Sequence, residues 1–157
     1  MTHQDTHNPN GQSLIHADGH VLAAVDGSAY AQSVGLLAGW AASRLGADLE
    51  LLHAIDRGGN DARADLSGAL ALGAQEALLA EIAGLDEQRA RLAQAHGREL
   101  LENLRAALAS AYGITARGRQ RHGALVDVLL EAEPQVRLFV IGKRGEHADV
   151  AAGHLGS

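Results

Sequence analysis

LFVIGKRGEHADVAAGHLGS, residues 138–157, is the stretch of sequence around which the rest of the chain is organised. It opens with an apolar run, 138–142, that predicts a buried strand. A turn with two glycines and two cations follows, Gly142-Lys143-Arg144-Gly145. In α/β folds, a buried strand that leads into a glycine-rich basic turn presents backbone N–H groups to a phosphate, and glycine lets the ligand come close. The alternative is an ordinary strand-to-loop turn on a basic surface.

The composition restricts the class of protein. The 157 residues suffice for one domain with a hydrophobic core. The chain has no cysteine, which excludes disulfides and thiolate chemistry, and its formal net charge of −6 argues against broad nucleic-acid binding. No apolar run is long enough to span a membrane, and residues 1–20 lack the apolar segment of a signal peptide. We therefore expect a cytoplasmic protein.

The N-terminal residues 1–18 are polar, with His3, His7 and His16 among them. Such a composition buries too little apolar surface to order itself, which predicts a disordered leader. Metal binding is the alternative, but the histidine spacings are irregular and no cysteine accompanies them. The domain is therefore expected to occupy residues 19–157.

A βαβ unit is predicted after the leader. Val21–Val25 is a continuous apolar run, typical of a strand covered on both faces, and Leu49–Ile55 is a second strand. Between them a helix is expected over 29–45, with Ser28 as its N-cap. The unit implies parallel strands and a right-handed crossover. His53 is interpreted as a hydrogen-bonded core residue. The buried face of the helix is expected to consist of Tyr30, Val34, Leu37, Ala38, Ala41 and Leu45.

A long helix is predicted over residues 74–112, ended by Gly113. Gly84 and Gly97 weaken the helix, so a kink or a division into two helices is an alternative. The charged residues of this segment are interpreted as a solvated face rather than a binding surface. The expected apolar face consists of Leu78, Ile82, Leu85, Leu92, Leu100, Leu104 and Leu108.

The last predicted elements before the opening strand are a weak strand over 114–121 and a short helix over 124–133. The strand has Arg117, Arg119 and Arg121 at every second position, which favours a sheet edge protected by charge. An anion-binding row of arginines is the alternative. The short helix is expected to turn Leu125, Val126, Leu129 and Leu130 inward.

The alternation of strands and helices predicts a three-layer α/β fold around a parallel sheet. In such sheets ligands bind outside the carboxyl ends of the strands, where the strand order reverses. The turns expected to converge there follow the strands at residues 26–28, 53–56 and 142–145. None of them resembles a catalytic triad or a pair of acid–base carboxylates. The pattern favours a protein that holds a phosphorylated ligand over an enzyme that transforms it.

Four pieces of the chain, in order, resemble the universal stress protein family. They are residues 21–28, the second strand with its following aspartate (51–56), Arg121-His122-Gly123, and 141–145 together with Leu155-Gly156-Ser157. The resemblance runs from about residue 20 to the end of the sequence. It implies a parallel sheet of strand order 3-2-1-4-5 in a Rossmann-like fold. It also implies a cytoplasmic protein of stress responses, usually dimeric, from a family in which some members bind ATP and others do not.

The family members that bind ATP carry Gly, two residues, Gly, nine residues, Gly, then Ser or Thr. Gly142 and Gly145 match the first pair of glycines, and Gly156 with Ser157 matches the end of the pattern. The intervening stretch has ten residues, one more than the pattern. The resemblance thus implies that the backbone N–H groups of this turn contact phosphate oxygens.

The same resemblance assigns further nucleotide contacts. Asp26 matches the nucleotide-contacting aspartate after the first strand, and Ala54 matches the position whose backbone meets the adenine. Lys143 or Arg144 would add positive charge beside the phosphates. Magnesium would arrive with ATP and need few protein ligands, so no separate metal site is expected.

The family's last helix and fifth strand, which would follow Ser157, are absent from the sequence. We therefore expect a C-terminally shortened domain or the first domain of a tandem protein, with the fourth strand at an exposed edge. A homodimer or a tandem second domain are the possible protein partners.

The leading functional hypothesis is an ATP-binding protein of stress response or regulation, with slow or no hydrolysis. The first alternative is the same fold without nucleotide, acting as a protein-interaction module. A nucleotide-dependent enzyme such as an adenylyl transferase is a further alternative. It would need a HIGH-type or glycine-rich phosphate motif after the first strand, and residues 26–29 are neither.

Overall fold

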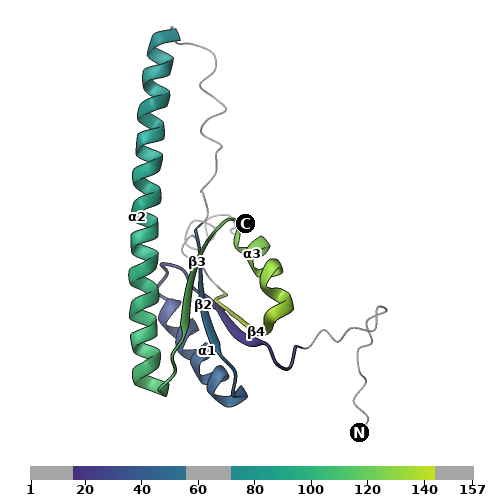
Figure 1. The fold of residues 1–157 in the computed structure, drawn as a ribbon. Coiled ribbons are helices and arrows are strands. Elements are labelled where there is room, and N and C mark those ends of the chain that lie inside the picture. The colour runs from purple at the N-terminus through teal and green to yellow at the C-terminus, as the bar shows by residue number, and fades with distance from the viewer. Residues whose placement is uncertain (1–15, 56–71, 144–157) are drawn as a thin grey trace, which may run out of the picture.

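The fold is built on a four-stranded parallel sheet (Figure 1). The structure, a computed structural model, describes residues 16–55 and 72–143. The strands are β1 (His20–Ala24), β2 (Leu49–Ile55), β3 (Arg117–His122) and β4 (Val136–Ile141), in the spatial order β3-β2-β1-β4. This confirms the predicted order of the first four strands. Of the predicted leader, residues 1–15 lie outside the described residues.

Helices cover both faces of the sheet, as the three-layer prediction requires. Helices α1 (Ala31–Leu45) and α2 (Leu72–Tyr112) pack on one face. Helix α3 (Leu125–Ala132) packs on the other and leads through a short 3-10 turn, η2 (Glu133–Gln135), into β4. Figure 1 shows that α2 runs far past the sheet at its N-terminal end.

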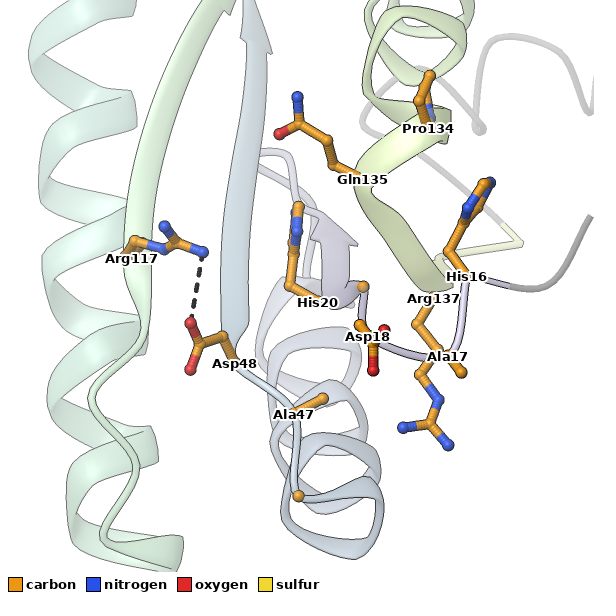
Figure 2. A pocket seen from close by; sticks show the side chains of 12 residues that line it. His16, Ala17, Asp18, His20, Ala47, Asp48, Arg117, Pro134, Gln135 and Arg137 are labelled. Carbon is orange, nitrogen blue, oxygen red and sulfur yellow. Dashed lines mark ion pairs between the residues drawn. The ribbon is translucent and has the colours of Figure 1, made fainter.

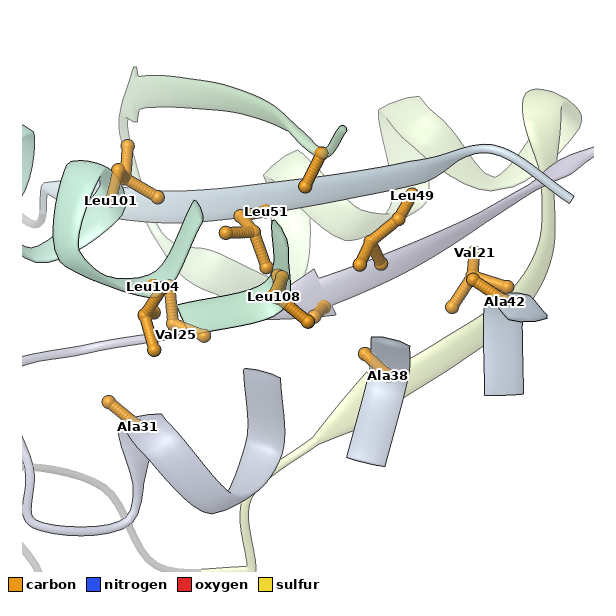
Figure 3. Close-up of a cluster of buried hydrophobic side chains, with 12 residues drawn as sticks. Val21, Val25, Ala31, Ala38, Ala42, Leu49, Leu51, Leu101, Leu104 and Leu108 are labelled. Atoms are coloured by element: carbon orange, nitrogen blue, oxygen red, sulfur yellow. The ribbon is translucent and has the colours of Figure 1, made fainter. Parts of the chain in front are cut away.

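Two apolar clusters form the core, one on each face of the sheet. Alternate residues of a strand point to opposite faces, so neighbouring positions of β1 and β2 contribute to different clusters. The larger cluster joins β1 and β2 to α1 and α2 (Figure 3), and includes Val21, Ala23, Leu49, Leu51, Leu101, Leu104 and Leu108. The smaller cluster joins the same strands to α3 and β4, and consists of Leu22, Leu52, Val128, Ala132 and Val136.

Helix α1 starts later than the sequence predicted. Of its predicted buried face, Ala38 and Ala41 are buried and Val34 and Leu45 pack partly buried against the core, whereas Tyr30 and Leu37 are exposed. Its N-cap is Tyr30, and Ser28 instead accepts the backbone N–H of Tyr30 through Oγ at 3.3 Å. The buried positions are Ala31, Gly35, Ala38, Gly39, Ala41 and Ala42, whereas Tyr30, Leu37 and Trp40 are exposed. Small residues are buried because α2 packs directly on this face, and the side chain of Leu108 lies where a Cβ of Gly39 would be. The predicted end at Gly46 is confirmed by its left-handed φ of 59°.

Helix α2 is one continuous helix of 41 residues, which excludes the predicted alternative of two helices. Its apolar face is buried only in the C-terminal half, at Leu101, Leu104 and Leu108. Leu85 and Leu92 are exposed, because a helix of this length extends about 60 Å while the seven-residue β2 extends about 23 Å. The predicted apolar face is thus buried in its second half, whereas in the first half Leu78 and Ile82 are only partly buried.

The remaining helix, α3, buries Val128 and Ala132. Of the residues predicted to face inward, Leu125, Val126 and Leu130 are exposed and Leu129 is partly buried. Strand β3 is an edge of the sheet, as predicted, and β4 is the opposite edge among the described residues.

Candidate functional site

The carboxyl ends of β1 and β4 lie next to each other. The two strands are parallel neighbours, and Ala24 at the end of β1 is paired with Ile141 at the end of β4. Asp26 and the pair Gly142-Lys143 therefore leave the sheet side by side, at the carboxyl ends of adjacent strands. The chain order also reverses here, because β1 is followed by α1 on one face while β4 is reached through α3 on the other. This is where α/β sheets bind ligands.

A local turn orients the carboxylate of Asp26. Its Oδ1 accepts the backbone N–H of Ser28 at 3.1 Å, the arrangement by which aspartate stabilises a turn two residues ahead. The Ser28 hydroxyl in turn accepts the N–H of Tyr30 at the start of α1. The Asp26 side chain is thus held between the end of β1 and the first helix.

The backbone of Ala54 lies beyond the last paired residues of β1 and β2. Pairing between these strands ends at Ala24 and Leu52, and the N–H of Val25 donates to the carbonyl oxygen of Leu52 at 2.9 Å. In a parallel sheet, alternate residues direct their N–H and C=O groups to the same neighbour. Ala54 therefore directs its backbone polar groups toward the side of β1, past the point where the ladder stops. This is the geometry that contact with a ligand would require.

His53 joins the two strand ends. Its Nδ1 lies 3.0 Å from the carbonyl oxygen of Val25, and because a carbonyl only accepts, Nδ1 carries the proton and donates. The interpretation of His53 as a hydrogen-bonded structural residue is confirmed. Its partner, the residue before Asp26, could not be predicted from the sequence.

Gly97 of α2 makes room for this arrangement. A Cβ at Gly97 would collide with the side chains of His53 and Gln120. Gln120 is held in turn, because its Nε2 donates to the carbonyl oxygen of Gln94 at 3.1 Å. The glycine that appeared only to weaken the helix is therefore a site of close approach between α2 and the sheet.

Four of the predicted site residues lie outside the described residues: Arg144, Gly145, Gly156 and Ser157. The structure places the other four, Asp26, Ala54, Gly142 and Lys143, at the carboxyl ends of the strands. Lys143 is exposed there and Gly142 is partly buried. Within residues 16–55 and 72–143, no group of three His, Asp or Glu side chains is arranged to hold a metal ion.

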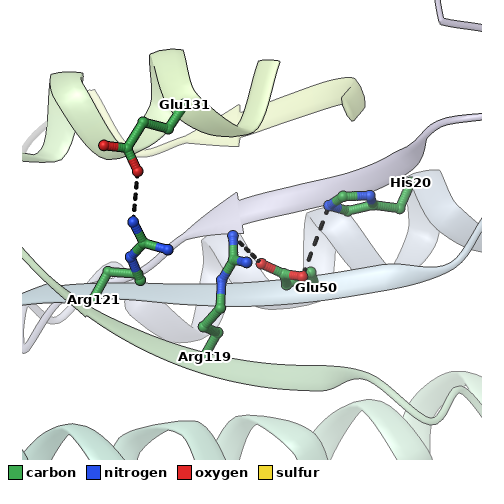
Figure 4. Close-up of polar contacts among 5 residues, drawn as sticks. All are labelled: His20, Glu50, Arg119, Arg121 and Glu131. Atoms are coloured by element: carbon green, nitrogen blue, oxygen red, sulfur yellow. Dashed lines mark hydrogen bonds and ion pairs between the residues drawn. The ribbon is translucent and has the colours of Figure 1, made fainter. Parts of the chain in front are cut away.

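The three arginines of β3 are each paired with a carboxylate (Figure 4 shows two of the pairs). The shortest N···O distances are 3.7 Å for Arg117–Asp48, 2.9 Å for Arg119–Glu50 and 2.5 Å for Arg121–Glu131. Because each guanidinium already has an anionic partner, the edge interpretation fits better than an anion-binding row of arginines.

Glu50 is the buried carboxylate of this group, with 7% of its surface exposed. Arg119 approaches it from β3, and Nε2 of His20 on β1 lies 3.9 Å from Oε2 (Figure 4). Neither His20 Nε2 nor Glu50 Oε1 has a partner in hydrogen-bonding geometry among the described residues. The contact with Arg119 is therefore an ion pair without an aligned hydrogen bond.

An open hollow of about 1040 Å³ lies at the amino ends of the strands, on the opposite side of the sheet from the candidate site (Figure 2). Acidic and basic side chains both line it, including Asp18, Asp48, Arg117 and Arg137. Arg117 is paired with Asp48, and Arg137 donates to the carbonyl oxygen of Leu45 at 3.4 Å. Both arginines thus have a partner within the protein, and none of the predicted nucleotide contacts that the structure describes lies here.

Comparison with known proteins identifies the relatives of this chain. The model of the universal stress protein family matches residues 19–157. Universal stress protein Slr1230 of Synechocystis sp. is 31% identical over 140 residues, which cover 88% of this chain and 49% of the relative. The chain therefore spans about half the length of that curated relative.

Solved structures share the fold. Universal stress protein UspA from Lactobacillus plantarum has a TM-score of 0.62 at 17% identity, with 83% of this chain and 81% of that chain covered. A family member from Burkholderia pseudomallei has a TM-score of 0.57 at 18% identity, with 87% and 88% covered. A universal stress protein crystallised in complex with cAMP has a TM-score of 0.52 at 20% identity, with 89% and 84% covered. Within the described ranges, no helix combines the length and apolar composition needed to cross a bilayer.

Proposed function

The chain belongs to the universal stress protein family, and on that premise we propose that it binds an adenine nucleotide and acts in stress response or regulation. The observation that carries the proposal is that Asp26 and Gly142-Lys143 follow the ends of adjacent strands, at the point where the chain order reverses. A universal stress protein of the same fold has been crystallised with cAMP, which supports this ligand class. ATP with magnesium is the form that we propose for this chain.

The described residues at this edge provide donors and acceptors that fit such a ligand. The backbone of Ala54, past the end of the β1–β2 ladder, suits the hydrogen-bonding edge of an adenine ring. The carboxylate of Asp26 suits a hydroxyl group of the ribose, and the ammonium group of Lys143 suits a phosphate. Arg144 and the amides of Gly145, Gly156 and Ser157 are proposed to complete the phosphate contacts.

We propose that the protein holds the nucleotide rather than transforming it. The residues proposed to contact it supply one carboxylate, one or two cations and backbone amides, a set suited to binding and orientation. Bound magnesium would screen the phosphate charges, and with no three-ligand cluster among the described residues it would be held mainly by the phosphates. We expect hydrolysis to be slow or absent.

Calorimetric titration of the full chain tests the proposal, with ATP plus magnesium and with cAMP as separate ligands. We expect micromolar-range binding of ATP that is lost in the Gly142→Val, Gly145→Val double variant, because the added side chains block close approach to the backbone. Gly84→Ala is the matched control, since a Cβ at this exposed position of α2 meets nothing within 4 Å. A folded chain that binds neither ligand would refute the proposal.

The second candidate is a protein-interaction module without nucleotide. One observation favours it: apolar side chains are exposed on α3 and β4, with 65% of Val126, 62% of Leu130 and 52% of Ile141 accessible. Where exposed apolar side chains adjoin, they often mark a contact with another protein. Failure of nucleotide binding, together with binding of a hydrophobic dye that a Val126→Lys, Leu130→Lys variant abolishes, would favour this alternative.

A further inference from the structure

The first half of α2 stands away from the rest of the fold. Hydrogen bonds join α2 to β3 at Gln94, whose carbonyl oxygen accepts from Gln120 and whose side chain contacts His122. Burial against the sheet begins at Gly97 and continues at Leu101. Figure 1 shows the preceding turns of α2 extending past the sheet as a single helix. The sheet and α1 thus pack against the C-terminal part of α2, and the preceding turns of the helix project past them.

This segment carries a leucine at every seventh position. Leu78, Leu85 and Leu92 recur at this spacing, and Ile82 falls between the first two at the position that completes an a/d pattern. Leu85 and Leu92 are 51% and 71% exposed, and the other two are partly buried. Exposed leucines add little to the stability of an isolated helix, so this row is suited to packing against a second helix.

The apolar row points away from the helix's own sheet. Gly97, Leu101, Leu104 and Leu108 define the line along which α2 contacts the body of the protein. At about 3.6 residues per turn, the row of Leu78, Leu85 and Leu92 lies roughly a third of a turn from that line. A second helix can therefore lie along the row without meeting the sheet of the same chain.

Charge on the same segment is divided into two blocks. Residues 76–87 contain four acidic residues and no basic ones, and residues 89–98 contain three arginines and no acidic ones. Arg89 also falls within the apolar row, at an a position between Leu85 and Leu92. In a parallel pair of helices, each charged block would face the same block of the other copy, and the two Arg89 side chains would face each other. In an antiparallel pair, the acidic block of one copy faces the basic block of the other, and the exposed Glu87–Arg91 ion pair within each helix lies where the two blocks adjoin.

We propose that two copies of this chain associate through the projecting half of α2, as an antiparallel helix pair centred near residue 87. The apolar row supplies the contact, and the two charge blocks select the antiparallel orientation. The interface is made of residues of α2, and none of the nucleotide contacts proposed above belongs to this helix.

Sedimentation equilibrium of the full chain tests the association. We expect a dimer at about 100 μM protein, and a dissociation constant raised about a hundred-fold or more in a Leu85→Asn, Leu92→Asn variant, which removes the apolar contact without adding charge. The matched control is Leu37→Asn, Trp40→Asn on α1, which alters two apolar side chains of similar exposure, 56% and 50%. The control should dimerise as the wild type does. A monomeric wild type, or a dimer unaffected by the α2 variant, would overturn the proposal.

The orientation is tested by disulfide formation, because the chain has no cysteine of its own. An antiparallel pair centred near residue 87 brings residue 78 of one copy to residue 96 of the other. A mixture of Leu78→Cys and His96→Cys chains should therefore cross-link, and Leu78→Cys alone should not. The reverse result, with Leu78→Cys chains linking to themselves, would show a parallel pair and overturn the antiparallel assignment.

Discussion

Replacement of Arg119 by leucine tests the energetic role of the buried carboxylate on β2. Glu50 is 7% exposed, and the guanidinium of Arg119 lies 2.9 Å from its Oε1. Removal of one partner from a buried ion pair leaves a buried charge uncompensated, which destabilises proteins by about 3–5 kcal/mol. The Arg119 side chain is 42% exposed, so water partly replaces it. We therefore expect Arg119→Leu to lower the free energy of unfolding by about 2 kcal/mol.

The control for this change lies two residues away on the same strand. Arg117 pairs with Asp48 at 3.7 Å, and the Asp48 side chain is 83% exposed. Exposed ion pairs contribute about 0–1 kcal/mol, so Arg117→Leu should have a small effect. Because both substitutions put leucine in place of arginine on the edge strand, their difference isolates the burial of the carboxylate.

Urea unfolding followed by circular dichroism measures both variants. With a slope of about 1–3 kcal/mol per molar urea, a loss of 2 kcal/mol lowers the midpoint by about 1 M. The Glu50→Leu, Arg119→Leu double variant should recover much of this loss, because apolar side chains often replace buried ion pairs without destabilisation. If Arg119→Leu is no more destabilising than Arg117→Leu, the carboxylate does not depend on its arginine and the reasoning is wrong.

Three further predictions concern single positions. Gly97→Ala should lower the free energy of unfolding by about 1–3 kcal/mol, since the added Cβ collides with His53. Gly84→Ala should raise it by about 0.5–1 kcal/mol, and thermal unfolding of the two variants should therefore show shifts of the melting temperature in opposite directions. His53→Phe removes the hydrogen bond to Val25, so we expect a loss of about 1 kcal/mol in urea unfolding and several-fold weaker nucleotide binding by calorimetry; unchanged values for both would contradict the role of His53 at the strand ends. Gly46→Ala should cost about 1 kcal/mol, because alanine is strained at a φ of 59°, and an unchanged melting temperature would argue against that strain.

Much of the fold could be predicted from local patterns in the sequence. The bounds of β2 were predicted to the residue. Most of its seven consecutive residues are apolar, which is typical of a strand covered on both faces. Strand β3 was placed at an edge by its alternating arginines, and the end of α1 was placed at Gly46. Each of these features depends on residues close together in the chain, which is why a single sequence contains enough information for them.

The buried faces of the helices were harder to predict. Leu37 and Trp40 are exposed on α1 although they are large and apolar, and Gly39 is buried beside Leu108. The size of the residues that α1 buries is determined by how closely α2 approaches, and that distance depends on side chains about 70 positions away in sequence. Periodicity identifies a candidate apolar face, but it does not show what will cover it.

For the candidate site, the sequence by itself determined the candidate residues: an aspartate after one strand, a glycine-rich basic turn after another, and a backbone position on a third. Only the tertiary structure decided that Asp26 and Gly142-Lys143 leave adjacent strands, through the pairing of Ala24 with Ile141. It also decided that His53 holds the end of β1. The physical reason is that chemical identity is a property of each residue, whereas proximity arises from strand pairing and packing between segments distant in the chain.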